Sequence, residues 1–230
     1  MHLKSYLKLY KKKECRRPTV IGWFILLIFI VFIFSFLGHN AYSFLAITNP
    51  VVSKIIVIEG HIPDYAIDSA KVIIAKNKDS LIFTSGVPMI QGSYLCGYKN
   101  YAELTAASLI SVGIDSSSII IVPCNPKQKD RTYETALALN RRFQMMNLTE
   151  EYFNILTSVT HARRTRLFFQ LVFGEKWKIG IISITATNYD TKKWWTSSFG
   201  LRAVIYEGIA LMYAKFFFYT KNTDDNANRN

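Results

Sequence analysis

The sequence predicts an α/β fold: a mostly parallel, Rossmann-like sheet of about five strands with helices on both faces, preceded by one N-terminal transmembrane helix. Short runs rich in Ile, Val, Leu and Phe recur along the chain, and each is followed by a longer amphipathic segment of helical period. Apolar strands linked by crossover helices are typical of a parallel sheet that is covered on both faces. A third observation, an uncharged run near the N-terminus, predicts the membrane helix.

Residues 19–38 are expected to cross a membrane. The run from Thr19 to Leu37 carries no charge, and a helix needs about 20 apolar residues to span the hydrocarbon layer. Residues 1–18 form a basic tail with seven lysines and arginines against one glutamate, which holds this flank in the cytoplasm. The rest of the chain is then expected outside, in the periplasm or beyond it, as a single-pass protein of a bacterial inner (cytoplasmic) membrane. The alternative is a cleaved signal peptide, whose apolar run is usually about 7–15 residues and is followed by a small-x-small cleavage site.

Five strands and five helices are expected in alternation. Each strand is an apolar run that ends at polar or turn-forming residues, and each helix shows apolar residues at spacings of three and four. The strands are expected at residues 54–60, 81–86, 118–122, 152–156 and 178–184. The helices are expected at residues 64–76, 98–112, 132–146, 160–172 and 199–218.

The last helix is expected to pack on the sheet and not to form a second span. Arg202, Glu207 and Lys215 interrupt it, and a charge at the bilayer centre costs about 2.5–3.5 kcal/mol on insertion scales. An amphipathic helix that touches the membrane through residues 216–219 fits this pattern. The domain is therefore expected at residues 53–220, with a linker at 39–52 and a disordered polar tail at 221–230.

The composition argues against two kinds of partner. The tail supplies half of the formal net charge of +12, and the other half is spread over the rest of the chain, so nucleic-acid binding is not expected. The three cysteines form no C-x-x-C pair, and no metal site is expected. Cys96 and Cys124 follow predicted strands, and the sequence leaves open whether they form a disulfide.

Polar residues gather where the predicted strands end. Asp130-Arg131-Thr132-Tyr133-Glu134 follows the third strand, and Thr157-Ser158-Val159-Thr160-His161-Ala162-Arg163-Arg164 follows the fourth. Ligands of open α/β sheets bind beyond the carboxyl ends of the strands. Hydroxyls, guanidinium groups and the free backbone N–H groups of helix starts suit an anionic ligand.

The order of these motifs resembles the YdcF/SanA/ElyC family over residues 53–215. The motifs are the Thr84-Ser85-Gly86 turn, an acidic helix start at Glu103, Arg-Thr-Tyr-Glu-Thr-Ala from Arg131, Thr-Ser-x-x-His-x-x-Arg from Thr157 and Trp-Trp-x-Ser-Ser-x-Gly-x-Arg-x-x-x-x-Glu from Trp194. The resemblance implies a Rossmann-like domain with a role in envelope integrity and in peptidoglycan or surface-polysaccharide metabolism. Both Asn positions of the family's Asn-Thr-x-Glu-Asn motif are replaced here, by Arg131 and Thr135.

The candidate site combines both lines of inference. The possible catalytic residues are His161, Glu103 and Ser158. The possible ligand-binding residues are Gly60, Thr84, Ser85, Gly86, Arg131, Thr132, Glu134, Thr160 and Arg163, with Arg164 as the alternative to Arg163. Structural roles compete with these: Thr132 and Thr160 as helix caps, Glu207 as an ion-pair partner of Arg202 or another cation, and Trp194 and Trp195 as either core or a lip facing membrane or glycan.

Two function classes remain open. In the first, the domain is an envelope enzyme acting on a phosphorylated or glycosylated precursor, with Arg131 and Arg163 holding phosphate, His161 as general acid or base, and Glu103 or Glu59 orienting a water. In the second, the same crevice binds an anionic ligand without chemistry, and the protein is an assembly or regulatory factor with a protein partner. A cytoplasmic domain would instead favour a nucleotide-type ligand. A serine hydrolase is disfavoured because no Gly-x-Ser-x-Gly elbow is present. The sequence leaves the cofactor unknown.

Overall fold

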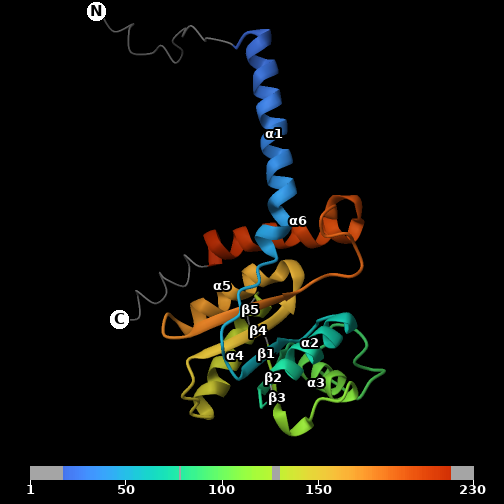
Figure 1. Cartoon of the computed structure of the whole chain (residues 1–230), viewed down its shortest axis with the longest axis vertical. Coiled ribbons are helices and arrows are strands. Elements are labelled where there is room, and N and C mark those ends of the chain that lie inside the picture. Colours follow the sequence, from blue (N-terminus) through green and yellow to red (C-terminus); the bar gives the residue numbers. More distant parts are fainter. Residues whose placement is uncertain (1–17, 78, 126–129, 219–230) are drawn as a thin grey trace, which may run out of the picture. The chain divides into compact units, whose positions relative to one another are not determined.

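The computed structural model describes residues 18–77, 79–125 and 130–218 (Figure 1). The chain divides into two compact units, residues 1–39 and residues 40–230. Helix α1 (Val20–Leu45) starts in the first unit and ends in the second. It is long and apolar enough to cross a membrane, which fits a single span as well as a signal sequence. The expected basic tail, Cys15 and the polar C-terminal tail lie outside the described residues.

The sheet has the predicted five strands, all parallel: β1 (Ile55–Glu59), β2 (Leu81–Gly86), β3 (Ile119–Pro123), β4 (Tyr152–Ser158) and β5 (Lys178–Ile184). Their order is β3-β2-β1-β4-β5. The chain builds outward from β1 through β2 to β3, then returns to the other side of β1 for β4 and β5. The order therefore reverses between β1 and β4, which is the position where α/β sheets open a crevice.

Helices cover both faces of the sheet, as predicted. Helices α2 (Asp64–Lys76) and α3 (Tyr101–Ser111) lie on one side of the strands, and α4 (Arg131–Met145) and α5 (Ala162–Phe173) lie on the other (Figure 1). A hydrophobic core lies on each face of the sheet, and alternate residues of β1 pack into one or the other. Ile56 and Ile58 pack toward α2 and α3, whereas Ile55 and Val57 pack toward α4 and α5. The alternation follows from the pleat of the strand, and it fixes which strand-end residues can face the crevice.

The predicted closing helix is α6 (Ser198–Tyr213), followed by a π-helical turn (Ala214–Phe218). Its inner side buries Val204 and Glu207. Val204 packs in a small core with Trp194 and with Leu45 at the end of α1. Of the two tryptophans considered as a lip, Trp194 is thus part of this core, and Trp195 is exposed.

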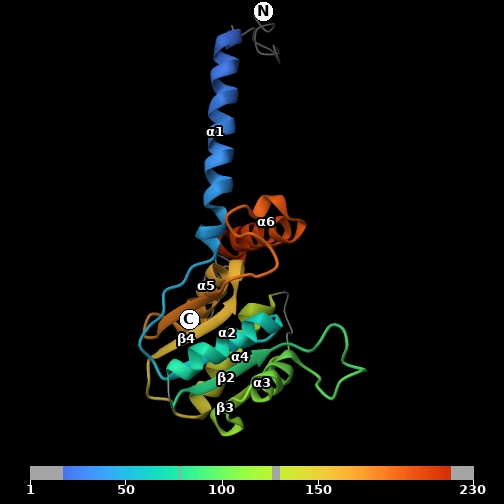
Figure 2. The same cartoon turned by 45° about the vertical axis from the view of Figure 1, so that its right-hand side comes forward.

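The segment between α1 and β1 is tied to the sheet. Asn49 forms a bridge with Ile181 of β5. The Asn154 side chain of β4 accepts a hydrogen bond from the Val51 amide at 2.8 Å and donates one to the Val51 carbonyl at 2.7 Å. The expected linker at 39–52 thus contains the last turns of α1 and then a segment, residues 46–52, that runs along β4 and β5 and that we call the strap. Figure 2 shows the strap beside the sheet.

Candidate functional site

A pocket of about 770 Å³ opens at the carboxyl ends of the strands, beside the point where the strand order reverses. Three strand ends supply residues to it: Glu59 and Gly60 after β1, Ser85 and Gly86 in β2, and Thr157 and Ser158 in β4. The first turn of α4 adds Asp130, Arg131 and Thr132, the α5 side adds His161 and Arg164, and α6 adds Tyr206, Glu207, Ile209 and Tyr213. The ends of three strands and three helical elements therefore contribute to one cavity.

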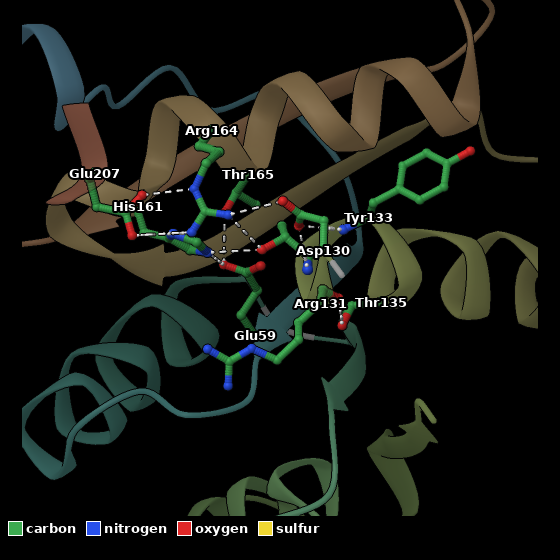
Figure 3. A network of polar contacts seen from close by, with 10 residues as sticks. Glu59, Asp130, Arg131, Tyr133, Thr135, His161, Arg164, Thr165 and Glu207 are labelled. Atoms are coloured by element: carbon green, nitrogen blue, oxygen red, sulfur yellow. Dashed lines mark hydrogen bonds and ion pairs between the residues drawn. The ribbon is translucent and has the colours of Figure 1, made fainter. Parts of the chain in front are cut away.

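Glu207 and Arg164 form the centre of a buried network on the α5–α6 side of the pocket (Figure 3). Arg164 donates through Nε to Oε2 of Glu207 at 2.9 Å and through Nη2 to Oε1 at 3.1 Å. Burial alone would raise the pKa of Glu207, but hydrogen bonds and charge from His161 and Arg164 outweigh it and lower the pKa to about 2. Glu207 therefore stays ionised and anchors both partners.

The pKa of Arg164 is shifted by the same surroundings. Burial would lower this pKa, but the hydrogen bond to Glu207 and the charges of Glu207, Asp130 and Glu59 raise it. Oδ2 of Asp130 lies 3.8 Å from Nη1 of Arg164, and the same Nη1 donates to Thr132 at 3.4 Å. Most N–H groups of this guanidinium are engaged by Glu207, His161 and Thr132, so its main role is to position these neighbours.

His161 occupies a position that suits both of its protonation states. Its Nδ1 lies 3.1 Å from Oε1 of Glu207 and 2.9 Å from Nη2 of Arg164. A carboxylate only accepts hydrogen bonds and a guanidinium only donates them. Nδ1 therefore has a partner in either tautomer: it donates to Glu207 when it carries a hydrogen and accepts from Arg164 when it does not.

The other ring nitrogen of His161 faces residues of the pocket. Nε2 lies 3.4 Å from the Thr132 hydroxyl and 3.8 Å from Oε2 of Glu59. Glu59 is held in place by a hydrogen bond of 3.0 Å from the Thr165 hydroxyl. A carboxylate and an imidazole side by side in a cavity are a suitable pair for general acid and base chemistry.

Two buried hydroxyls of the pocket lack a hydrogen-bond partner within the described part of the chain. Ser85 and Thr157 are both fully buried, and neither side-chain oxygen has a partner there. Both residues line the pocket. Leaving a buried polar group unsatisfied costs about 1–3 kcal/mol, and such groups are rare in native proteins. Both oxygens are closed to solvent in the pocket as it stands, so a ligand contacts them only when their side chains rotate toward the cavity.

Arg131 is a cation that takes no part in the network of Glu207, Arg164 and His161. It lines the pocket from the first turn of α4 and is exposed. No carboxylate among the described residues lies within ion-pair distance of it. The Asp130 side chain caps α4 by accepting from the Thr132 and Tyr133 amides, and the Arg131 guanidinium is left to line the pocket.

Close backbone packing shapes the floor of the pocket. A Cβ atom on Gly60 would lie 2.5 Å from the Ser85 carbonyl oxygen, and one on Gly86 would lie 2.7 Å from the Ala102 nitrogen. His61, next to Gly60, has a φ of 69°, a region that is costly for residues other than glycine. Burial, followed by the charges of Arg131 and His161, lowers the pKa of His61, so its imidazole is neutral at pH 7.

The structure brings seven of the predicted site residues to the pocket and leaves five outside its lining. Those in the lining are Gly60, Ser85, Gly86, Arg131, Thr132, Ser158 and His161. Thr84, Glu103, Glu134, Thr160 and Arg163 are not among the lining residues. Thr84 lies on the same face of β2 as Ile82, the face that α2 and α3 cover, because it alternates with Ser85 along the strand.

Glu103 and Arg163 are engaged elsewhere. Glu103 completes the N-terminal cap of α3, since its carboxylate accepts from the Lys99 amide at 3.0 Å and from the Asn100 side chain at 2.7 Å. Arg163 donates to the Phe44 carbonyl, and its guanidinium lies 4.0 Å from the centre of the Phe44 ring. Of the residues considered for orienting a water or holding phosphate, Glu59 and Arg131 line the pocket, whereas Glu103 and Arg163 do not.

Three local expectations need correction. The helix cap at α4 is Asp130 and not Thr132. Thr160 does not cap α5; its hydroxyl donates to the Ala203 carbonyl at 3.3 Å. Glu207 pairs with Arg164 and His161 and not with Arg202, because the inner side of α6 faces the start of α5.

Two pocket residues had a usable signal that the prediction did not fully exploit: Arg164 was named only as the alternative to Arg163, and Glu207 only as an ion-pair partner. Arg164 lies three residues after His161, a spacing that places both side chains on one side of a helix, whereas Arg163 lies about 200° around the helix from His161. Glu207 is the one acid of α6, which is typical of a buried ion pair. Asp130, Thr157 and the α6 tyrosines could not be assigned in advance, because their roles depend on tertiary packing.

Among the described residues, no three His, Cys, Asp or Glu side chains are arranged to hold a metal ion, and Cys96 and Cys124 are free thiols. No protein-family model, curated protein or solved structure matches the chain. The parallel sheet alone does not define a function, which has to follow from the chemistry of the pocket.

Proposed function

We propose that the chain is a membrane-anchored, extracytoplasmic protein of cell-envelope biogenesis that binds a phosphorylated sugar precursor in the pocket at the strand ends. The resemblance to the YdcF/SanA/ElyC family supports the envelope role, and the apolar helix α1 with its basic flank supports the anchor and the topology. The ligand class is supported by the pocket itself. The observation that carries the proposal is the exposed Arg131 in the same cavity as the adjacent carboxylate and imidazole of Glu59 and His161.

The pocket chemistry favours a ligand that combines phosphate with hydroxyl groups. Arg131 is the cation available for a phosphate. Glu59 and Asp130 offer acceptors for sugar hydroxyls, and Ser85 and Thr157 offer both donors and acceptors. Tyr101, Tyr206 and Tyr213 supply aromatic surface against which a sugar ring packs. Three carboxylates line the pocket, those of Glu59, Asp130 and Glu207, and they would repel a ligand that carries only negative charge. The hydroxyl groups of a sugar phosphate can instead donate hydrogen bonds to carboxylates.

The same geometry favours hydrolysis or transfer at the phosphate. Glu59 is placed to take a proton from an attacking water or hydroxyl, and His161 to donate one to the leaving oxygen. Glu207 and Arg164 hold the His161 ring in position for this proton donation. The non-enzymatic alternative uses the same contacts for binding and needs no proton transfer.

Binding of N-acetylglucosamine 1-phosphate to the full chain in lipid nanodiscs, measured by calorimetry, tests the ligand class. We expect Arg131→Ala to weaken binding at least about tenfold, because a charged hydrogen bond is worth about 1.5–3 kcal/mol. Arg141→Ala, an exposed arginine of the same helix outside the pocket lining, is the matched control and should bind as the wild type does. Equal binding by the Arg131 variant would contradict the proposal.

Phosphate release from the same probe separates the enzyme from the binding protein. An enzyme should release phosphate, and Glu59→Gln and His161→Ala should abolish the release while still binding the probe. Binding without release in the wild type would favour the assembly or regulatory role. A phosphatase fused to the C-terminus should be active outside the cytoplasm, and inactivity there would contradict the topology.

A further inference from the structure

Helix α6 presents an apolar surface to solvent on the side opposite its buried face. Leu201, Ile205, Ile209, Met212 and Phe216 recur at spacings of three and four, and their exposed fractions run from 39% to 64%. The inward side of the same helix carries Val204, Glu207 and Ala214, which are buried. The outward residues therefore form one stripe along the helix, which we call the outer face of α6. Exposed apolar patches of this kind mark interaction sites.

The exposed charges near the outer face are mostly positive. Arg202 is exposed on α6 and Lys215 in the π-helical turn that follows it, whereas the one acid of α6, Glu207, is buried in the ion pair with Arg164; the exposed acid nearby is Asp190, in the turn before the helix. Lys192 and Lys193 are exposed in the turn just before it, next to the exposed Trp195. Lysine and arginine beside an apolar stripe, with a tryptophan at its edge, are the composition of a helix that lies in the headgroup layer of a membrane.

The candidate span ends at this helix. Within the second unit, Ala41, Tyr42 and Leu45 from the last turns of α1 pack with Val204 and Leu211 of α6 and with Trp194. Residue 38, the last of the predicted span, lies only three positions before Ala41. The chain thus fixes α6 within a few residues of the point where it would leave the membrane.

We propose that α6 is a second membrane contact, with its outer face in the interfacial layer of the bilayer that α1 crosses. Lipid is the occupant that these observations favour, because the anchor guarantees its presence and the positive rim suits anionic headgroups. Tyr206, Ile209 and Tyr213 are exposed on α6 and also line the pocket. The mouth of the pocket therefore lies beside the lipid headgroups. This inference is independent of the identity of the pocket ligand.

Site-directed spin labelling of the full chain in liposomes of phosphatidylcholine and phosphatidylglycerol tests the proposal. Cys15 and Cys96 are replaced by serine, and the buried Cys124 is kept. Labelling of this parent chain, before any cysteine is added, measures the background from Cys124. Single cysteines then replace Ile205, Ile209 or Met212. Ile110→Cys in α3 is the matched control, because Ile110 and Ile205 are the same residue type with exposed fractions of 45% and 50%, and α3 lies at the end of this unit away from α6 (Figure 1).

We expect labels on α6 to be more accessible to oxygen than to a water-soluble nickel chelate, and the label at residue 110 to show the reverse. Preferential nickel accessibility at all three α6 positions would overturn the proposal. So would oxygen preference at residue 110 as well, since the contact would then not be specific to α6. Low accessibility to both reagents with dipolar broadening between labels would also overturn it, and would assign the outer face of α6 to a second copy of the chain.

Discussion

Replacing Glu207 by glutamine removes the charge that holds the pocket network together while keeping the size of the side chain. The carboxylate side chain is 12% exposed and contacts Arg164 at 2.9 Å and His161 at 3.1 Å. Lowering its pKa from 4.5 to about 2 corresponds to about 3 kcal/mol of stabilisation of the ionised form, at 1.36 kcal/mol for each pKa unit. We therefore expect Glu207→Gln to lower the free energy of unfolding at pH 7 by about 3 kcal/mol.

The pH dependence of this loss follows from the direction of the shift. Because the pKa is lower in the folded than in the unfolded state, the carboxylate contributes its full stabilisation above pH 4.5. That stabilisation is lost as the pH falls from 4.5 toward 2. The difference between the wild type and Glu207→Gln should therefore be largest at neutral pH and should shrink through this range.

Urea unfolding of the full chain in detergent micelles, followed by tryptophan fluorescence at several pH values, measures both effects. Glu151→Gln is the matched control, because Glu151 forms an ion pair of similar length with Lys176 but on the surface, with side chains 43% and 74% exposed. An exposed pair contributes about 0–1 kcal/mol. A loss below about 1 kcal/mol for Glu207→Gln, or a loss that does not change with pH, would refute the reasoning.

Three further substitutions test other parts of the site. Gly86→Ala should destabilise the domain by about 1–3 kcal/mol in thermal unfolding, because its Cβ would meet the backbone of α3; an unchanged melting temperature would refute the close packing. Glu103→Ala should cost about 0.5–1 kcal/mol through the lost cap and leave binding of N-acetylglucosamine 1-phosphate intact, whereas lost binding would return Glu103 to the site. Arg163→Ala should also leave that binding unchanged in calorimetry, since Arg163 contacts Phe44; a tenfold loss would contradict the placement.

The sheet could be predicted from the sequence because each strand carries its own apolar signal. β4 continues two residues beyond its predicted end, to Ser158, because Thr157 and Ser158 pair with β5, a tertiary contact that no local pattern reports. The third helix of the fold starts at Tyr101 and not at Tyr98, since Asn100 caps it. Local chemistry therefore fixed the elements, and tertiary contacts fixed their ends.

The candidate site was only partly predictable. Residues at strand ends, such as Ser85 and Ser158, reach the pocket because parallel strands end at one edge of the sheet. Glu103 shows the limit, because an acid in the first turn of a helix suits a cap and a ligand site equally well. The contributions of α6 depend on how that helix crosses the strand ends, which its sequence does not specify.

Thr157→Val tests the central claim, that polar residues of the pocket lining serve a ligand and not the fold. Valine keeps the shape of the side chain and removes only the buried, unsatisfied oxygen. We expect the variant to be as stable as the wild type or more stable by about 1 kcal/mol, because the cost of the unsatisfied group is gone. Its affinity for N-acetylglucosamine 1-phosphate should fall up to about tenfold, the worth of one hydrogen bond. Lower stability with unchanged affinity would contradict the account, because the hydroxyl would then serve the fold and not the ligand.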